Sequence, residues 1–168
     1  KVYSERYDKL VLSPGAEPIR PPLPGINEKG IFTLRNVADT DYIKSYVQQF
    51  PFGRAVIIGA GFIGLEMAEN LHNLGMEVSI VEMANQVMAP LDYPMATLVQ
   101  QHIRSKGVNL YLNTTVTGFT REEDQLKVLV KDQEALEADI VILSIGVRPD
   151  TRLAAMAELK IGNARGIF

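Results

Sequence analysis

The chain has 168 residues, 46% of them hydrophobic, no cysteine and a formal net charge of −3. This length and apolar content suffice for one domain core, and the mild negative charge gives no basic field for nucleic acid or an anionic membrane. Without cysteine the chain offers no disulfide, thiol nucleophile or thiolate metal site, and we expect no metal. No apolar run reaches the ~20 residues of a membrane helix. Nothing resembles a signal peptide, so we expect a cytoplasmic protein.

The first third of the chain predicts strand and linker, followed by one helix. Residues 7–12 form an extended apolar run, and residues 31–34 a second short strand. Between them, four prolines between positions 18 and 24 exclude helix and sheet interior and favour a stiff connector. Apolar residues then recur at helical spacing over 40–49, where Asp39 or Thr40 can cap the helix.

A glycine-rich stretch follows the wholly apolar run 55–58, which is typical of a parallel strand buried on both faces. Gly59, Gly61 and Gly64 have G-x-G-x-x-G spacing, and a helical pattern starts at once. The first glycine permits the turn, the second lets backbone approach a pyrophosphate, and the third lets the helix pack closely on the sheet. Free N–H groups and the positive helix end then meet the phosphates. An ordinary glycine-rich turn is the alternative, but Glu82 at the end of the next strand favours a dinucleotide site.

Two further elements complete the βαβ rhythm. The helix after the glycines is expected to end at Gly75, and residues 77–81 form a strand that ends at Glu82. Asp92 can cap a second helix that ends at Gly107, before a third strand at 108–112. The buried stripe of this helix is predicted to comprise Met95, Leu98, Val99, His102 and Ile103. A histidine on such a stripe is structural rather than catalytic.

The last third departs from this rhythm. Short strands at 116–119, 126–131 and 134–138, joined by polar turns, predict a β-meander. Residues 140–145 return to the buried-strand pattern, and a short helix follows near 150–159. The sequence therefore predicts an α/β fold: a Rossmann-like dinucleotide-binding domain with a central parallel sheet, helices and a β-meander.

This order, followed by Gly-Val-Arg-Pro at 146–149, resembles the NAD(P)H-binding domain of FAD-dependent pyridine nucleotide-disulfide oxidoreductases. It is most similar to the branch of CoA-disulfide reductases, NADH oxidases and NADH peroxidases, and 81–88 and 91–95 look most like the first of these. The resemblance implies an NAD(P)H-binding domain at 36–146. Residues 1–35 and 147–168 resemble connections to an absent FAD domain. We expect an excised fragment, since the chain starts at a lysine and stops without a cap.

The resemblance also implies the cofactor-binding residues. Gly59, Gly61, Phe62, Ile63 and Gly64 would line the pyrophosphate and nicotinamide side, Glu82 would bind the adenosine ribose, Ile145 and Gly146 would flank the dinucleotide, and Glu66 matches a carboxylate near the nicotinamide. For Glu66 a solvent-facing position on the helix remains equally open, and Glu82 could simply end its strand in solvent. No cation follows Glu82 within four residues, so we expect NADH to be preferred over NADPH. No catalytic residue is expected in this segment.

The implied parent enzyme passes a hydride from NADH to FAD, which then reduces a disulfide such as that of CoA or a related acceptor. The FAD fingerprint, the redox cysteine and the later flavin motif of the family are absent from this chain, so we expect no turnover from it alone. The resemblance implies a homodimeric parent, while persulfide, oxygen and peroxide remain open as acceptors. Two alternatives stay open: the FAD-binding half of such an enzyme, or a non-catalytic nucleotide-sensing module. The ~50 residues before the fingerprint count against the FAD half, because a flavin domain normally opens its polypeptide.

Overall fold

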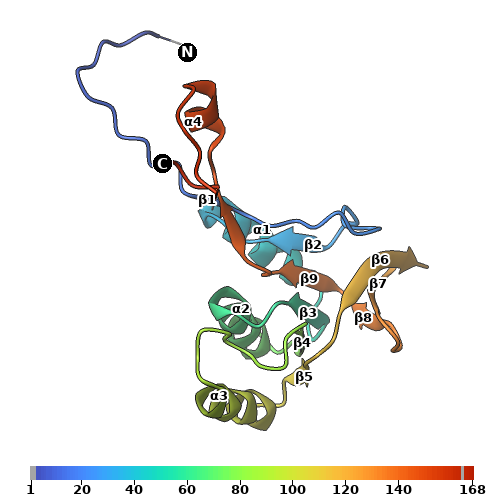
Figure 1. The fold of residues 1–168 in the computed structure, drawn as a ribbon. Coiled ribbons are helices and arrows are strands. Elements are labelled where there is room, and N and C mark those ends of the chain that lie inside the picture. Colours follow the sequence, from blue (N-terminus) through green and yellow to red (C-terminus); the bar gives the residue numbers. More distant parts are fainter. Residues whose placement is uncertain (1–2, 164) are drawn as a thin grey trace. The chain divides into compact units, whose positions relative to one another are not determined.

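A computed structural model describes residues 3–163 and 165–168 (Figure 1). Contacts divide the chain into two compact units. One is Pro18–Gly146, and the other combines the flanks before and after it. The functional boundaries predicted at residues 36 and 146 stay a prediction, because contacts alone do not define a ligand-binding domain.

A five-stranded parallel sheet forms the centre of the larger unit. Its strand order is β2-β9-β3-β4-β5, and every neighbouring pair is parallel. The two strands of the predicted βαβ unit, β3 and β4, lie at the apolar runs from which they were predicted. Strands buried on both faces need such continuous apolar sequence. The strands are β2 (Ile31–Thr33), β3 (Arg54–Ile58), β4 (Glu77–Val81), β5 (Asn109–Tyr111) and β9 (Ile140–Leu143).

The two faces of the sheet are covered by different layers. Alternate residues of β3 show the division: Ala55 and Ile57 pack among the helices, whereas Val56 and Ile58 pack against the meander. Figure 1 shows α2 and α3 on the side of the sheet away from the meander. The layers are α1 (Val37–Val47), α2 (Phe62–Asn73) and α3 (Tyr93–Ser105) on one face, and β6 (Val116–Glu122), β7 (Gln125–Val130) and β8 (Leu136–Ala138) on the other. The predicted fold class is confirmed.

The first helix begins earlier than predicted. Asn36 is its cap, and the side chain of Asn36 accepts the Asp39 N–H at 3.0 Å. The Asp39 carboxylate in turn accepts the Asn36 N–H at 3.1 Å, which completes a capping box. The prediction of Asp39 or Thr40 as cap was wrong because the buried stripe starts only at Ile43, well after the first helical residue, Val37.

The buried stripe of α3 was also predicted wrongly. Its buried residues are Ala96 and Gln100, with Val99 and Ile103 partly buried beside them. Met95, Leu98 and His102, which were predicted to be buried, are exposed. The helix is thus rotated relative to the prediction, so that Ala96 and Gln100 lie on its buried side. No helix among the described residues is both long enough and apolar enough to cross a membrane.

The smaller unit contains a two-stranded sheet and a short helix. Strand β1 (Ala16–Pro18) pairs with β10 (Val147–Pro149), and α4 (Arg152–Met156) follows. The Arg152 guanidinium donates to both carboxylate oxygens of Asp150, at 2.9 and 2.7 Å, and to Glu17 at 2.7 Å. These carboxylates, Asp150 first, raise the pKa of Arg152. The predicted extended run at 7–12 is irregular, because no strand of the described chain pairs with it.

Candidate dinucleotide site

The candidate site lies where the chain leaves the carboxyl ends of two central strands. Strands β3 and β9 are neighbours, yet the chain continues from β3 towards β4 on the other side. Such a reversal of strand order is a topological switch point, where open α/β sheets leave a crevice for ligands. Two backbone hydrogen bonds hold the ends of these strands together. The Gly59 N–H donates to the Val81 carbonyl at 2.9 Å, and the Ser144 N–H donates to the Ile58 carbonyl at 2.8 Å.

Two of the three glycines are required by the protein itself. Gly59 has φ +101°, and a Cβ there would lie 2.5 Å from the Ser144 carbonyl oxygen. A Cβ on Gly64 would overlap the Gly59 carbonyl oxygen and lie 2.7 Å from the Ser144 hydroxyl oxygen. Helix α2 can therefore sit this close to the sheet only because both positions lack a side chain.

Gly61 differs from the other two. Its φ and ψ are −81° and −172°, a conformation open to any residue, and a Cβ there would meet no atom within 4 Å. Neither backbone conformation nor packing within the described chain explains a glycine at this position. The space beside it is the room a pyrophosphate needs to contact backbone closely, so the residues present fit such a group.

The start of helix α2 adds donors to that space. Gly61 is the N-cap and contributes no side-chain acceptor, and the first intrahelical bond runs from the Leu65 N–H to the Gly61 carbonyl at 3.0 Å. The N–H groups of the first helical turn have no partner inside the helix, and the helix dipole makes this end positive. Phe62, at 65% exposure, and Ile63 stand at this end as exposed apolar side chains. The arrangement suits an anion flanked by an apolar ring system.

Glu82 follows β4 at the same edge, and its carboxylate faces backbone. One oxygen accepts the Ala60 N–H and the other accepts the Ala84 N–H, both at 2.8 Å. The peptide groups of Glu82 are held as well, by the Tyr111 carbonyl at 2.8 Å and the Thr114 N–H at 3.0 Å. A carboxylate offers about four acceptor sites, so two remain for a ligand while the backbone bonds persist.

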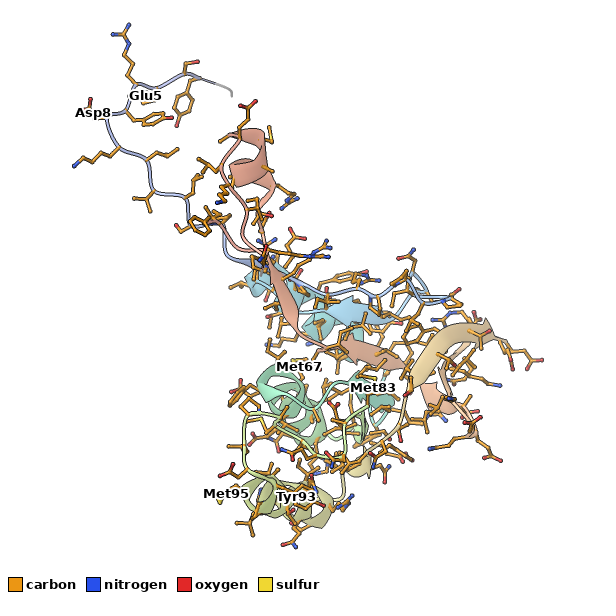
Figure 2. All side chains as sticks on the ribbon, in the orientation of Figure 1. Glu5, Asp8, Met67, Met83, Tyr93 and Met95 are labelled. Atoms are coloured by element: carbon orange, nitrogen blue, oxygen red, sulfur yellow. The ribbon has the colours of Figure 1, made fainter. Side chains whose placement is uncertain are left out.

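The segment after Glu82 is ordered by bonds of its own. We call residues 83–92, between β4 and α3, the 83–92 loop. The Met88 N–H donates to the Ala60 carbonyl at 2.9 Å, and Met88 has φ +51°. Met83, labelled in Figure 2, is 73% exposed directly after Glu82. Ala60 is therefore bonded on both sides, at its N–H by Glu82 and at its carbonyl by the 83–92 loop.

Ser144 is a site residue that the sequence-based predictions missed. Its hydroxyl lies 3.0 Å from the Ile58 carbonyl oxygen and 2.9 Å from that of Gly59, and it donates to this pair. It thereby joins the end of β9 to the glycine turn, directly beneath Gly64. A small hydroxyl residue closing a buried strand is the only sequence signal that pointed to it.

Most of the predicted cofactor-binding residues meet at this edge. The three glycines, Phe62, Ile63 and Glu82 surround the start of α2, and Ile145 and Gly146 follow β9, the neighbour of β3. Ile145 is exposed, and Gly146 has φ +107°. Glu66 is exposed on α2, two residues after the last of the glycines. The individual roles of these residues stay predictions.

Comparison with known proteins assigns the family. The model of the pyridine nucleotide-disulphide oxidoreductase family matches residues 2–168. The chain is 37% identical to an NADH oxidase of Methanocaldococcus jannaschii over 161 residues, which are 95% of this chain and 36% of that protein. The structure of reduced Bacillus anthracis CoADR-RHD has 48% identity and a TM-score of 0.90, with 97% of this chain and 29% of that one covered.

A third relative agrees with these two. The structure of an NAD-dependent persulfide reductase from A. fulgidus is 40% identical with a TM-score of 0.82, and the match covers 89% of this chain and 28% of that one. The chain thus spans about a third of the length of the relatives it matches. On the family match and these similarities, the chain belongs to the pyridine nucleotide-disulphide oxidoreductase family.

Proposed function

We propose that this chain is the NAD(P)H-binding domain of a flavoprotein reductase, which binds NADH and presents it to FAD held elsewhere in a longer protein. The observation that carries the proposal is Gly61, which lies at the start of a helix at the switch point. Among the described residues this glycine has neither a conformational nor a packing reason. A bound pyrophosphate supplies that reason, because only a bare backbone lets phosphate oxygens approach the helix N–H groups.

The proposal assigns a contact with the dinucleotide to each group of residues in the site. The backbone around Gly59, Gly61 and Gly64 binds the pyrophosphate, and Glu82 accepts hydrogen bonds from the hydroxyls of the adenosine ribose. Phe62, Ile63, Ile145 and Gly146 form the apolar and backbone surface next to the nicotinamide, with Glu66 one turn further along α2. When bound, the nicotinamide supplies a hydride that a flavin can accept. The chain itself binds, orients and keeps water from one side of the nicotinamide.

A preference for NADH over NADPH is part of the proposal. The carboxylate of Glu82 would repel a 2′-phosphate, and Met83 and Ala84 bring no cation to offset this. Two similar structures support it: a water-forming NADH oxidase from Lactobacillus brevis bound to NADH, and its engineered NADPH-bound form, each 32% identical to this chain. In the engineered form a glycine is replaced by alanine. Eighteen positions later an aspartate is replaced by alanine, and the alanine after it is replaced by arginine. Gly64 and Glu82 are also eighteen positions apart.

The whole-protein activity is proposed at the same level. Relatives named as CoA polysulfide or persulfide reductase and as NADH oxidase support a disulfide, a persulfide or oxygen as the terminal acceptor. We propose functional boundaries at 36–146, with 1–35 and 147–168 as connections to an FAD domain, within a cytoplasmic homodimeric parent. The resemblance alone supports the dimer.

Calorimetric titration of the purified chain with NADH, NADPH and FAD tests the proposal. We expect NADH to bind with one site per chain, no flavin to copurify, and no NADH oxidation when a disulfide is added. Flavin bound at unit stoichiometry would instead favour the FAD-binding half. If the full-length native protein binds the nucleotide but contains no flavin, the sensing module would be favoured.

A further inference from the structure

We propose that Gln100 on α3 is a positioning residue for the dinucleotide, acting through the 83–92 loop on the central residue of the glycine turn. The inference rests on the proposed function and deepens it, because it names a residue outside the ligand's reach that sets the shape of the site. Gln100 belongs to neither the glycine turn nor the strand end that carries Glu82.

Gln100 is a buried polar residue with one defined partner. Its side chain is 5% exposed, and its carbonyl oxygen accepts the Val87 N–H at 3.2 Å. Val87 is itself fully buried among the residues that pack under α2 and α3. A buried amide N–H without an acceptor is costly, so this bond determines the path of the loop at Val87.

The residue after Val87 reaches the glycine turn. Met88 adopts φ +51°, an unusual backbone conformation for a residue with a side chain, and from there its N–H donates to the Ala60 carbonyl at 2.9 Å. Two further bonds close the loop behind it: the Leu91 N–H donates to the Met88 carbonyl and the Gln86 side-chain amide donates to the Leu91 carbonyl, both at 2.8 Å. The contact with Ala60 therefore depends on a loop conformation that Gln100 holds from behind.

Ala60 is the residue through which these hydrogen bonds reach the proposed phosphate-binding turn. It is 1% exposed and lies between Gly59 and Gly61, the first two glycines of the proposed pyrophosphate-binding turn. Glu82 holds its N–H and Met88 holds its carbonyl, so the peptides on either side have a fixed orientation. Releasing the carbonyl lets the peptide between Ala60 and Gly61 rotate, which turns the following N–H groups away from a bound phosphate. The geometry thus links an interior glutamine to phosphate affinity.

Gln100→Met tests the link, because methionine keeps the length and burial of the side chain but removes the acceptor. We expect NADH affinity, measured calorimetrically well below the melting temperature, to fall about 2- to 12-fold, the range for one lost neutral hydrogen bond. Hydrogen exchange should speed up at the Val87 and Met88 amides and stay unchanged in β3. Gln100→Glu keeps an acceptor oxygen and should recover most of the affinity. Gln101→Met, at the exposed neighbour on α3, is the matched control and should change neither quantity.

The outcomes separate this inference from the proposed function. Unchanged NADH affinity in Gln100→Met, together with faster exchange at Val87, would reduce Gln100 to a purely structural role and overturn the inference alone. Equal losses in Gln100→Met and Gln100→Glu would do the same. Failure of the native chain to bind NADH would remove the proposed function. If Gln100→Met does not fold, native protein provides the test: saturating NADH should slow exchange at Met88, and an unchanged rate there would overturn the inference.

Discussion

At the carboxyl edge of the central sheet, a carboxylate bonds to backbone beside a helix start, whereas at the amino edge a guanidinium bonds to other side chains of the protein. Glu82 represents the first kind, with both carboxylate oxygens on backbone N–H groups. Arg54 represents the second, with its guanidinium on Glu137 and, at 2.9 Å, on Gln125. The Asp139 carboxylate accepts the Arg54 N–H at 2.7 Å.

The difference supports the carboxyl edge as the place of the proposed anion site. The amino edge also has a pocket, of about 220 Å³, but its lining includes Glu77 and Glu137 together with Asn109 and Ser79. Its cation, Arg54, is already paired with protein carboxylates. The carboxyl edge instead offers a helix start whose first N–H groups have no partner in the helix. The protein therefore pairs the cation of the amino edge internally, whereas the carboxyl edge is the one at which we propose that an anion binds.

The largest effect should come from Gly64→Val at the carboxyl edge. A Cβ there overlaps the Gly59 carbonyl, so α2 must move off the sheet, and overpacking of this kind costs about 1–3 kcal/mol. NADH affinity should fall together with stability, because packing and phosphate binding use the same backbone. Thermal melting and calorimetric titration of the variant measure both. A native melting temperature and a native affinity in Gly64→Val would contradict the site.

Glu82→Arg should change which coenzyme binds. Hydrogen bonds to a charged group contribute roughly 1.5–3 kcal/mol, so NADH affinity should fall about 10- to 150-fold, while NADPH affinity should rise. The gain should remain incomplete, because the Ala60 and Ala84 amides lose their acceptor at the same time. Titration with both coenzymes measures the switch. Glu77→Arg, at the opposite end of the same strand, is the control for charge alone. Native protein that binds NADPH as tightly as NADH would show that Glu82 does not contact the ribose.

Gly61→Ala separates ligand binding from stability. Because a Cβ at this position meets open space, unfolding free energy should change by no more than about 0.5 kcal/mol. NADH affinity should fall about 10-fold or more, since the methyl group occupies the place of a phosphate oxygen. Denaturant melts paired with titration give the two numbers. Equal affinity in Gly61→Ala and native protein would remove the observation on which the proposed function depends.

The smallest effect is expected at the amino edge, from Arg54→Met. The Arg54 side chain is 37% exposed and its ion pairs are partly hydrated, so stability should fall by less than about 1 kcal/mol and less still at high salt. NADH affinity should be unchanged within error. A loss of NADH affinity comparable to that of Glu82→Arg would mean that the two edges are coupled and that their separation is incorrect.

The sequence predicted the βαβ core well because its signals are local. Strand β4 was predicted with its observed bounds, and β3 differs by one residue, since buried parallel strands carry continuous apolar runs. The meander was predicted with its turn too wide: β6 and β7 pair up to Glu122 and Gln125, and only Glu123 and Asp124 turn, both with positive φ. Polar residues in an exposed hairpin do not mark where pairing stops.

Prediction was weaker where contacts with residues distant in sequence determine which side chains are buried or bonded. Helix α3 carries two possible stripes, and the wrong one was chosen because Met95 and Leu98 are more apolar than Ala96 and Gln100. The three glycines were identifiable from spacing. Ser144 was not, because its bond to the Gly59 carbonyl spans 85 residues, and Gln100 was missed because its bond to Val87 joins a helix to a loop. Tertiary contacts of this kind leave no periodic signal.

The place of β9 in the sheet has a consequence for how the protein is made. It lies between β2 and β3, yet it is the last of the five strands to leave the ribosome. The pairing of Ile31 with Val141 must close a loop of more than a hundred residues, and such non-local pairing slows folding. Until Ile140–Leu143 is synthesised, β2 and β3 both present unpaired, apolar edges that favour aggregation. A nascent chain that stalls before residue 140 therefore has a βαβ unit but lacks the strand that joins β2 to β3. A chaperone is most useful to the chain before this strand is synthesised.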